Sequence, residues 1–102
     1  MTTDMPRFSV ILPTHDRMEM LREAIASVVA QTFPDWELIV VDDASQGPIS
    51  EDELHHLAGD KARLLRLASS HGGAGAKSAG AAAARGQVLA FLDAHRDQSG
   101  II

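Results

Sequence analysis

The chain of 102 residues contains no cysteine, few aromatic residues and no excess of basic residues. Without cysteine it forms no disulfide, no thiolate metal site and no cysteine nucleophile. Aromatic residues make up only 4% of the chain, so a core must be built from Val, Ile, Leu and Ala. The formal net charge of -5 argues against a nucleic-acid-binding surface, because such a surface needs a basic patch.

Long apolar runs are also missing. No segment approaches the length of about 20 apolar residues that spans a membrane. The N-terminal "MTTDMPR" is polar, and "FSVILP" is too short for the apolar region of a signal peptide. We therefore expect a cytoplasmic location. A chain of this length is expected to form one small domain with one core.

The sequence does contain a regular alternation of two kinds of segment. Apolar runs rich in β-branched residues predict strands that are buried on both faces. Apolar residues at helical spacing predict amphipathic helices. The predicted strands cover residues 7–13, 36–45, 62–68 and 87–93, and the predicted helices lie in 17–31, 50–59 and 72–86.

Some residues mark the ends of the predicted helices. Asp16, followed three residues later by Glu19, resembles a capping box that would begin the first helix. Ser50 is the predicted N-cap of the second helix, and Gly59 ends it.

The order of the segments predicts an α/β fold, a mainly parallel sheet of about four strands with flanking helices. Ligands of such sheets bind beyond the carboxyl ends of the strands, where the strand order reverses. The segments predicted to follow the four strands carry "PTHD", "DDAS", "SSHGG" and "DAHRD", and they hold most of the polar residues of chemical interest.

Asp42 and Asp43 follow the second predicted strand. Taken alone, the pair favours an ordinary turn, because Asp is a common turn residue. A carboxylate at this position also accepts hydrogen bonds from a ribose hydroxyl or a base N–H in doubly wound sheets.

The glycine-rich stretch "HGGAGAKS" is close to a phosphate-binding loop. Lys77 and Ser78 fit that pattern, but His71 and Ala76 stand where glycine is required. A helix N-terminus with Lys77 in its first turns favours a diphosphate. A second interpretation is that the small residues let this helix pack close to the sheet. It is compatible with diphosphate binding.

Asp93 and His95 lie two residues apart at the end of the last predicted strand, so in extended backbone their side chains point the same way. A mixed oxygen and nitrogen ligand set suits Mn²⁺ better than Ca²⁺. The spacing alone favours two ordinary polar residues. His15 is expected in the first loop, facing a ligand or water, whereas His55 and His56 are expected on a solvated helix surface.

Together these motifs resemble the inverting family 2 glycosyltransferases of the GT-A fold. The signature of that family is V-I-I-P-T-Y-N-R, then S-x-x-x-Q-T-x-x-x-x-E, then I-V-V-D-D-x-S. The corresponding segments here are "VILPTHDR", "SVVAQTFPDWE" and "IVVDDAS", in the same order. The departures are His15-Asp16 in place of Tyr-Asn, Lys77-Ser78 in place of Arg-Asn, and "DAHR" in place of the D-x-D-D metal motif.

The last departure has a parallel in a related family. "GAAAARGQVLAFLDAH" resembles the polypeptide N-acetylgalactosaminyltransferases, whose Asp and His of a D-x-H motif bind Mn²⁺. The resemblance therefore implies a UDP-sugar donor and a metal cofactor, Mn²⁺ or Mg²⁺. It places Pro13 and Thr14 along the uracil, Asp43 at the uracil N3–H with Asp42 as a substitute, Lys77 near the diphosphate, and Asp93 and His95 on the metal.

Members of this family are considerably longer than this chain. We therefore expect residues 1–102 to form a single nucleotide-diphospho-sugar-binding domain that stops before the acceptor-binding half. Such a chain supplies the donor and metal site of a glycosyltransferase but neither an identified catalytic base nor an acceptor site. The alternatives are a non-catalytic nucleotide-binding or interaction module and a small ATP- or GTP-binding phosphate loop. Apolar surface left by the missing half is expected to drive self-association.

Overall fold

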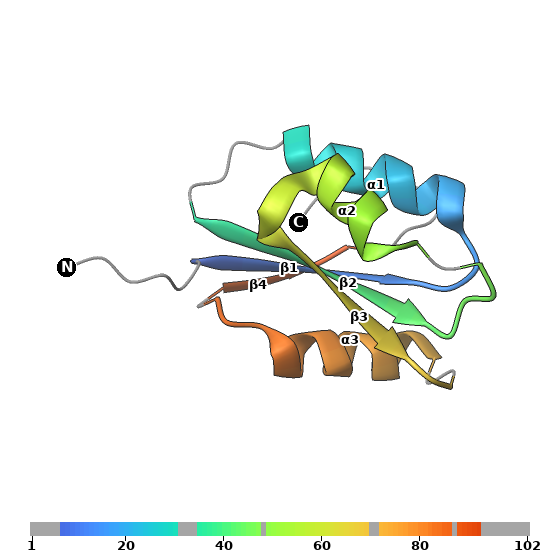
Figure 1. Cartoon of the computed structure of the whole chain (residues 1–102). Helices are drawn as coiled ribbons and strands as arrows, with labels where there is room; N and C mark the ends of the chain where they lie inside the picture. The colour runs from blue at the N-terminus through green and yellow to red at the C-terminus, as the bar shows by residue number, and fades with distance from the viewer. Residues whose placement is uncertain (1–6, 31–34, 48, 70–71, 87, 93–102) are drawn as a thin grey trace.

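The computed structural model describes residues 7–30, 35–47, 49–69, 72–86 and 88–92. The elements in chain order are β1 (Phe8–Thr14), α1 (Met18–Ala30), β2 (Trp36–Asp43), α2 (Glu51–Ala58), the short 3₁₀ helix η1 (Gly59–Lys61), β3 (Ala62–Leu67), α3 (Gly72–Ala83) and β4 (Val88–Phe91). The four strands form one parallel sheet in the order β3-β2-β1-β4 (Figure 1). The predicted α/β fold is confirmed, and each observed helix and strand lies within or beside its predicted range.

The helices cover both faces of the sheet. Figure 1 shows α1 and α2 on one face and α3 on the other. The chain steps outward from β1 to β2 to β3 and then returns past β1 to β4. A right-handed crossover in the reverse direction places its helix on the opposite face. Because the chain turns back in this way, the strand order reverses between β1 and β4. No helix in the described part of the chain is long and apolar enough to cross a membrane.

Each face of the sheet has its own apolar core, because alternate residues of a strand point to opposite faces. The larger core lies under α1 and α2, and it includes Val10 and Leu12 of β1. The smaller core lies under α3 and includes Ile11. At Gly80 of α3 an added Cβ would overlap Ile11 Cγ2 and lie 3.0 Å from Val41 Cγ2. The expectation that small residues let this helix pack close to the sheet is thus confirmed.

The helix ends agree with the sequence in one case and differ in another. Ser50 caps α2 as predicted, because its Oγ accepts a hydrogen bond from the Glu53 N–H at 3.1 Å. The predicted capping role of Asp16 is wrong. Asp16 has a φ of 51°, and its carboxylate accepts the N–H of Gln46 in the loop after β2. A contact with a distant loop has replaced the local one.

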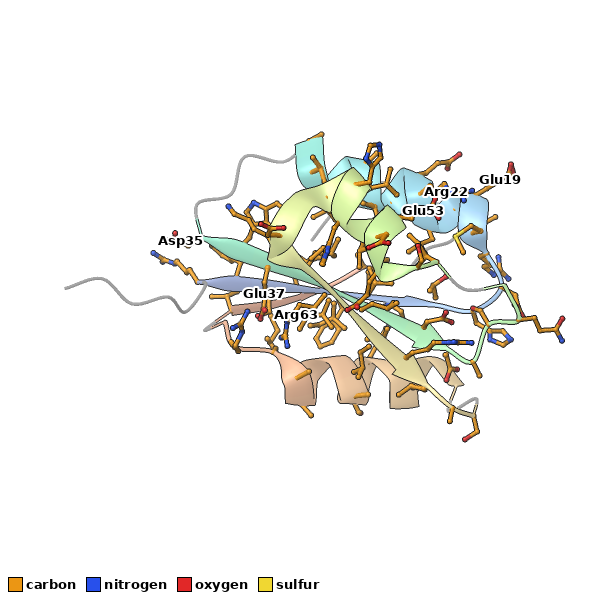
Figure 2. The ribbon with its side chains drawn as sticks, in the orientation of Figure 1. Glu19, Arg22, Asp35, Glu37, Glu53 and Arg63 are labelled. Atoms are coloured by element: carbon orange, nitrogen blue, oxygen red, sulfur yellow. The ribbon has the colours of Figure 1, made fainter. Side chains whose placement is uncertain are left out.

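A buried carboxylate holds the amino ends of the strands together. We call Ser9, Glu37, Arg63, Arg85 and Gly86 the Glu37 cluster. Glu37 Oε2 accepts from the Ser9 hydroxyl at 2.6 Å and from the Arg85 N–H at 2.8 Å. Its Oε1 accepts from Arg63 at 3.1 Å and from the Arg85 guanidinium at 3.2 Å. Figure 2 shows Glu37 and Arg63 side by side above α3. The Ser9 Oγ in turn accepts the Gly86 N–H at 2.8 Å, which fixes the chain as it enters β4.

The cluster also sets the ionisation of Glu37. Its side chain is only 3% exposed, and this burial by itself raises the pKa of the carboxyl. The hydrogen bonds from Ser9 and Arg85, together with the charge of Arg63, outweigh burial and hold the pKa below its ordinary value of 4.5. A lowered folded-state pKa means that the ionised group stabilises the fold above that ordinary value. The contribution is lost as the pH falls through the folded-state pKa.

We expect Glu37→Gln to lower the free energy of unfolding by about 1–3 kcal/mol near neutral pH, because donors around the site lose a charged acceptor. The stability of the variant should also fall less than that of the wild type when the pH is lowered below the ordinary carboxyl pKa. Urea unfolding across pH measures both effects. The matched control is Glu23→Gln, since Glu23 is exposed on α1. Equal stability losses in the two variants would contradict the role given to Glu37.

Candidate functional site

The loops that follow β1 and β2 are joined by hydrogen bonds at the carboxyl edge of the sheet. The Asp16 N–H donates to Ser45 Oγ at 2.8 Å, and the Gln46 N–H donates to Asp16 Oδ1 at 2.8 Å. His15 Nδ1 lies 2.6 Å from the Asp43 carbonyl oxygen, so this ring nitrogen carries a proton. These contacts give the two loops one fixed arrangement. His15 remains about half exposed at their surface, with 52% of its side chain accessible.

Asp42 is completely buried at the end of β2. Its Oδ1 accepts the Ser45 N–H at 2.9 Å and so holds the tight turn in which Ala44 has a φ of 62°. Its Oδ2 has no hydrogen-bond partner among the described residues, and the same is true of Thr14 Oγ1. Thr14 is the register partner of Asp42. Buried polar atoms are almost always paired, so this pair marks a place where a bound molecule or water would supply partners.

Asp43 points to the opposite face and contacts the start of α3. Its Oδ2 accepts the Gly72 N–H at 3.0 Å, which ties the end of β2 to the first residue of that helix. The residue is 5% exposed. Lys77 follows in the second turn of α3 and is half-buried. The sheet therefore brings Asp42 and Asp43 together with Pro13 and Thr14 at one edge, and α3 begins at that edge.

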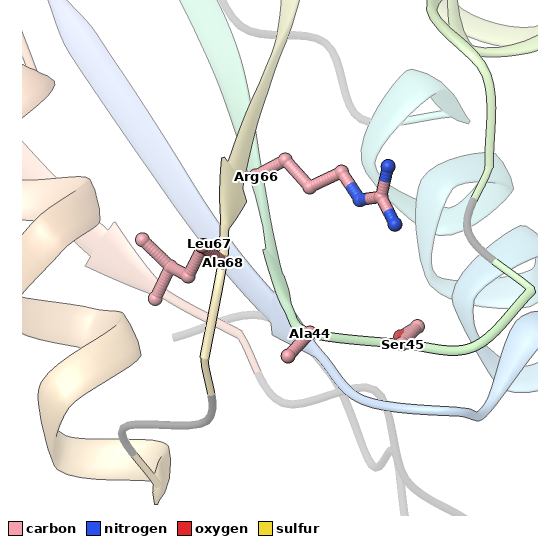
Figure 3. Close-up of a pocket in the computed structure, with 5 residues that line it drawn as sticks. All are labelled: Ala44, Ser45, Arg66, Leu67 and Ala68. Carbon is pink, nitrogen blue, oxygen red and sulfur yellow. The ribbon is translucent and has the colours of Figure 1, made fainter.

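A pocket of about 430 Å³ opens between the ends of β2 and β3 (Figure 3). Its lining residues are Ala44, Ser45, Arg66, Leu67 and Ala68. Figure 3 shows Arg66 and Leu67 pointing to opposite sides of β3. Ser45 and Arg66 were not among the site residues predicted from the sequence. The available signal was Arg66, a charged residue near the end of the apolar strand β3. Only the strand register shows that its side chain lines the pocket.

The predicted metal ligands Asp93 and His95 lie outside the described residues. β4 runs toward the same edge, and the Leu92 N–H that follows it donates to the Ile11 carbonyl at 2.9 Å. Asp93 is the next residue of the sequence. Among the residues described, no group of three or more His, Asp or Glu side chains could hold a metal ion.

A parallel sheet with a reversal of strand order and a pocket at the carboxyl ends of its strands is the arrangement of ligand-binding α/β domains. The sequence model described as "Glycosyl transferase family 2" matches residues 9–96. The chain therefore belongs to glycosyltransferase family 2, as the resemblance of its motifs implied.

A curated relative and a solved structure are similar to this chain. The O-antigen biosynthesis protein RfbC of Myxococcus xanthus is 41% identical over 92 residues, which cover 87% of this chain and 7% of that protein. The crystal structure of S. aureus TarS 1–349 in complex with UDP superposes with a TM-score of 0.75 at 26% identity, over 86% of this chain and 27% of that one.

A second solved structure adds a different nucleotide and a metal. The mannosyltransferase PcManGT from Pyrobaculum calidifontis, in complex with GDP-Man and Mn²⁺, has a TM-score of 0.72 at 25% identity. The match covers 88% of this chain and 28% of that one. The chain thus spans about a quarter of the length of the solved structures that it resembles.

Proposed function

We propose that this chain provides the donor-nucleotide site of a family 2 glycosyltransferase that uses a UDP-sugar. The observation that carries the proposal is the gathering of polar side chains at the carboxyl ends of β1 and β2, beside the pocket: Asp43 is bound to the start of α3, and Thr14 Oγ1 and Asp42 Oδ2 are buried without partners among the described residues. The family assignment supports a nucleotide-sugar as the ligand. The UDP bound to TarS supports uridine as its base.

The two carboxylates at the end of β2 take different parts in this proposal. Asp42 holds the turn through the Ser45 N–H and has no exposed surface. Asp43 keeps 5% of its surface exposed at the edge and is our first choice for the acceptor of the uracil N3–H. Pro13 and Thr14, on the neighbouring strand, would lie along the uracil ring.

In this proposal the diphosphate lies near the start of α3, which is bound to Asp43 at the end of β2, and the metal lies beyond the end of β4. The N-terminal end of α3 offers backbone N–H groups, and Lys77 adds a positive charge. Asp93 and His95 would hold Mn²⁺, or Mg²⁺, together with oxygen atoms of the diphosphate. Such a cation stabilises the UDP leaving group when the glycosidic bond breaks. A carboxylate and an imidazole fit Mn²⁺ by the chemistry of their donor atoms.

The resemblance implies that the acceptor site and the catalytic base lie in the longer part of family members, which this chain does not match. We therefore propose that the 102-residue chain binds the donor and transfers no sugar by itself. A non-catalytic nucleotide-binding module is the alternative, and sugar transfer by a fusion of this chain to the unmatched part of a family 2 relative would distinguish the two.

The assignment of Asp43 predicts that Asp43→Asn weakens UDP binding by about 1–3 kcal/mol, because the amide puts an N–H where the N3–H must be accepted. Asn keeps one oxygen for the Gly72 N–H, so the fold should survive. Asp42→Asn should have the smaller effect and serves as the matched control. Calorimetric titration with UDP measures both. Equal and negligible effects would return the two residues to a purely turn-forming role.

The metal assignment predicts that Mn²⁺ strengthens UDP binding in the wild type and that His95→Ala abolishes the gain. His95→Asp restores the commoner acidic motif and should largely keep it. An imidazole must be neutral to bind a metal, so the gain should shrink as the pH falls toward about 6.5. Titrations of UDP with and without Mn²⁺ across pH give the readout. An affinity for UDP that is the same with and without Mn²⁺, and the same in His95→Ala, would contradict the assignment.

We also propose that two copies of the chain associate through β4. This strand lies at one edge of the sheet, and three of its side chains, Val88, Leu89 and Phe91, are 44%, 39% and 40% exposed. β4 has no charged residue, whereas the opposite edge strand β3 carries Arg63 and Arg66. An uncharged apolar edge pairs readily with another strand. Two identical edges that pair antiparallel close into a two-fold dimer.

The dimer should dissociate in Leu89→Lys, because a charge on an edge strand opposes pairing. Leu57→Lys is the control, since Leu57 is similarly exposed (37%) but lies on α2. Sedimentation equilibrium over a range of concentrations would show the wild type and the control associating and the β4 variant remaining a monomer. A wild type that stays monomeric throughout would refute the proposal.

A further inference from the structure

The loops that follow β1 and β2 each contain a residue with left-handed backbone. Asp16 has a φ of 51°, and Ala44 has a φ of 62°. Residues other than glycine rarely adopt this conformation, because their Cβ crowds the neighbouring peptide groups. It persists only where surrounding contacts compensate for the strain, and such places are frequent at ligand-binding sites. The contacts that hold these two loops therefore bear on the function of the carboxyl edge.

The turn at Ala44 is held from two sides. On the β2 side, the Ala44 N–H donates to the Asp42 carbonyl oxygen at 3.0 Å, and the Ser45 N–H donates to Asp42 Oδ1 at 2.9 Å. From the β1 loop, the His15 Nδ1–H donates to the Asp43 carbonyl oxygen at 2.6 Å. That carbonyl belongs to the peptide group between Asp43 and Ala44. His15 thus fixes the peptide plane whose rotation would release the strained residue.

Asp43 is held at two points as a result. His15 binds its main-chain carbonyl, and the Gly72 N–H at the start of α3 donates to its Oδ2 at 3.0 Å. The residue is only 5% exposed. A carboxylate that is fixed at the main chain and at one oxygen has little rotamer freedom left to lose when a ligand binds.

We infer that His15 is a positioning residue, whose Nδ1–H holds the main chain of Asp43 so that the carboxylate is in place for the nucleotide. The inference rests on the proposed function, in which Asp43 accepts the N–H of the base. Position 15 must then supply a side-chain N–H donor, and an aromatic ring is not required. The His15 Nε2 also lies 3.2 Å from Asp16 Oδ2, but these side chains are 52% and 44% exposed, and ion pairs so exposed contribute little.

Two substitutions separate the donor from the ring. His15→Asn removes the ring but keeps an N–H donor at the same number of bonds from the main chain as Nδ1. His15→Phe keeps an aromatic ring and has no donor. We expect His15→Asn to bind UDP within about twofold of the wild type and His15→Phe to lose about 3- to 10-fold, the range that corresponds to one hydrogen bond. Calorimetric titration measures these affinities.

A second measurement needs no nucleotide. The Ser45 N–H should exchange with deuterium about 3- to 10-fold faster in His15→Phe than in the wild type, because the turn opens more often. In His15→Asn it should exchange at the wild-type rate. His56→Phe is the control for both measurements, since His56 is exposed on α2, and it should change neither the affinity nor the exchange rate.

Loss of UDP affinity in His15→Asn with full affinity in His15→Phe would overturn the inference, because the ring itself would then contact the nucleotide. Equal affinities in the two variants, both retained or both reduced, would also overturn it. Unchanged exchange of the Ser45 N–H in His15→Phe would overturn it and leave the proposed function intact. A wild type that binds no UDP would remove the proposed function, and the positioning role with it, even with the exchange rates as expected.

Discussion

The buried carboxylate of Glu37 is the interaction on which the arrangement of the sheet depends most. It lies on β2 and is bound by Ser9 of β1, Arg63 of β3 and Arg85 at the entry to β4. A buried charge is costly unless it is paired and hydrogen-bonded, and Glu37 takes its partners from all three neighbouring segments. The return of the chain from α3 to β4 is thereby held beside β1. That return creates the reversal of strand order at which ligands of such folds bind.

Polar groups are paired differently at the amino ends and at the carboxyl ends of the strands. At the amino edge every oxygen of Glu37 is occupied, and Ser9 both donates and accepts. At the carboxyl edge Thr14 Oγ1 and Asp42 Oδ2 are buried without partners in the described part of the chain, and Arg66 extends beside an open pocket. At the amino ends both Glu37 oxygens find partners within the chain, although Arg63 Nε is buried there without a partner among the described residues. At the carboxyl ends the unpaired atoms are a hydroxyl and a carboxylate oxygen, the groups that the proposed ligand would contact.

The loops at the carboxyl edge are held rigid by contacts with one another. The Asp16 N–H donates to Ser45 Oγ, and the Gln46 N–H donates to the Asp16 carboxylate, so two hydrogen bonds join the β1 and β2 loops. Asp43 joins the same edge to the start of α3. Loops that are already joined in this way would lose less ordering entropy when the proposed nucleotide binds. His15 and Asp16, which replace the usual Tyr-Asn of the family, serve these loop contacts.

The sequence by itself determined the α/β class, the order of the elements and the family. Continuous apolar runs such as "IVV" before Asp42 and the helical spacing of Leu21, Ile25 and Val28 are local patterns, and buried parallel strands and amphipathic helices follow from them. The motif resemblance named the family because several segments occur in order. Local pattern failed at Asp16, where a capping box was predicted and a loop 30 residues away is contacted instead.

Only the tertiary structure decided which polar residues meet. Asp42 and Asp43 are adjacent in the chain, yet the alternation of a strand sends one toward Thr14 and Arg66 and the other toward Gly72. Arg63 and Arg66 look alike in "ARLLRLA", but opposite faces and opposite edges give one a buried partner and the other a pocket. These distinctions depend on strand register and on sheet order. Both are set by contacts between segments far apart in the chain, and no local pattern of residues encodes them.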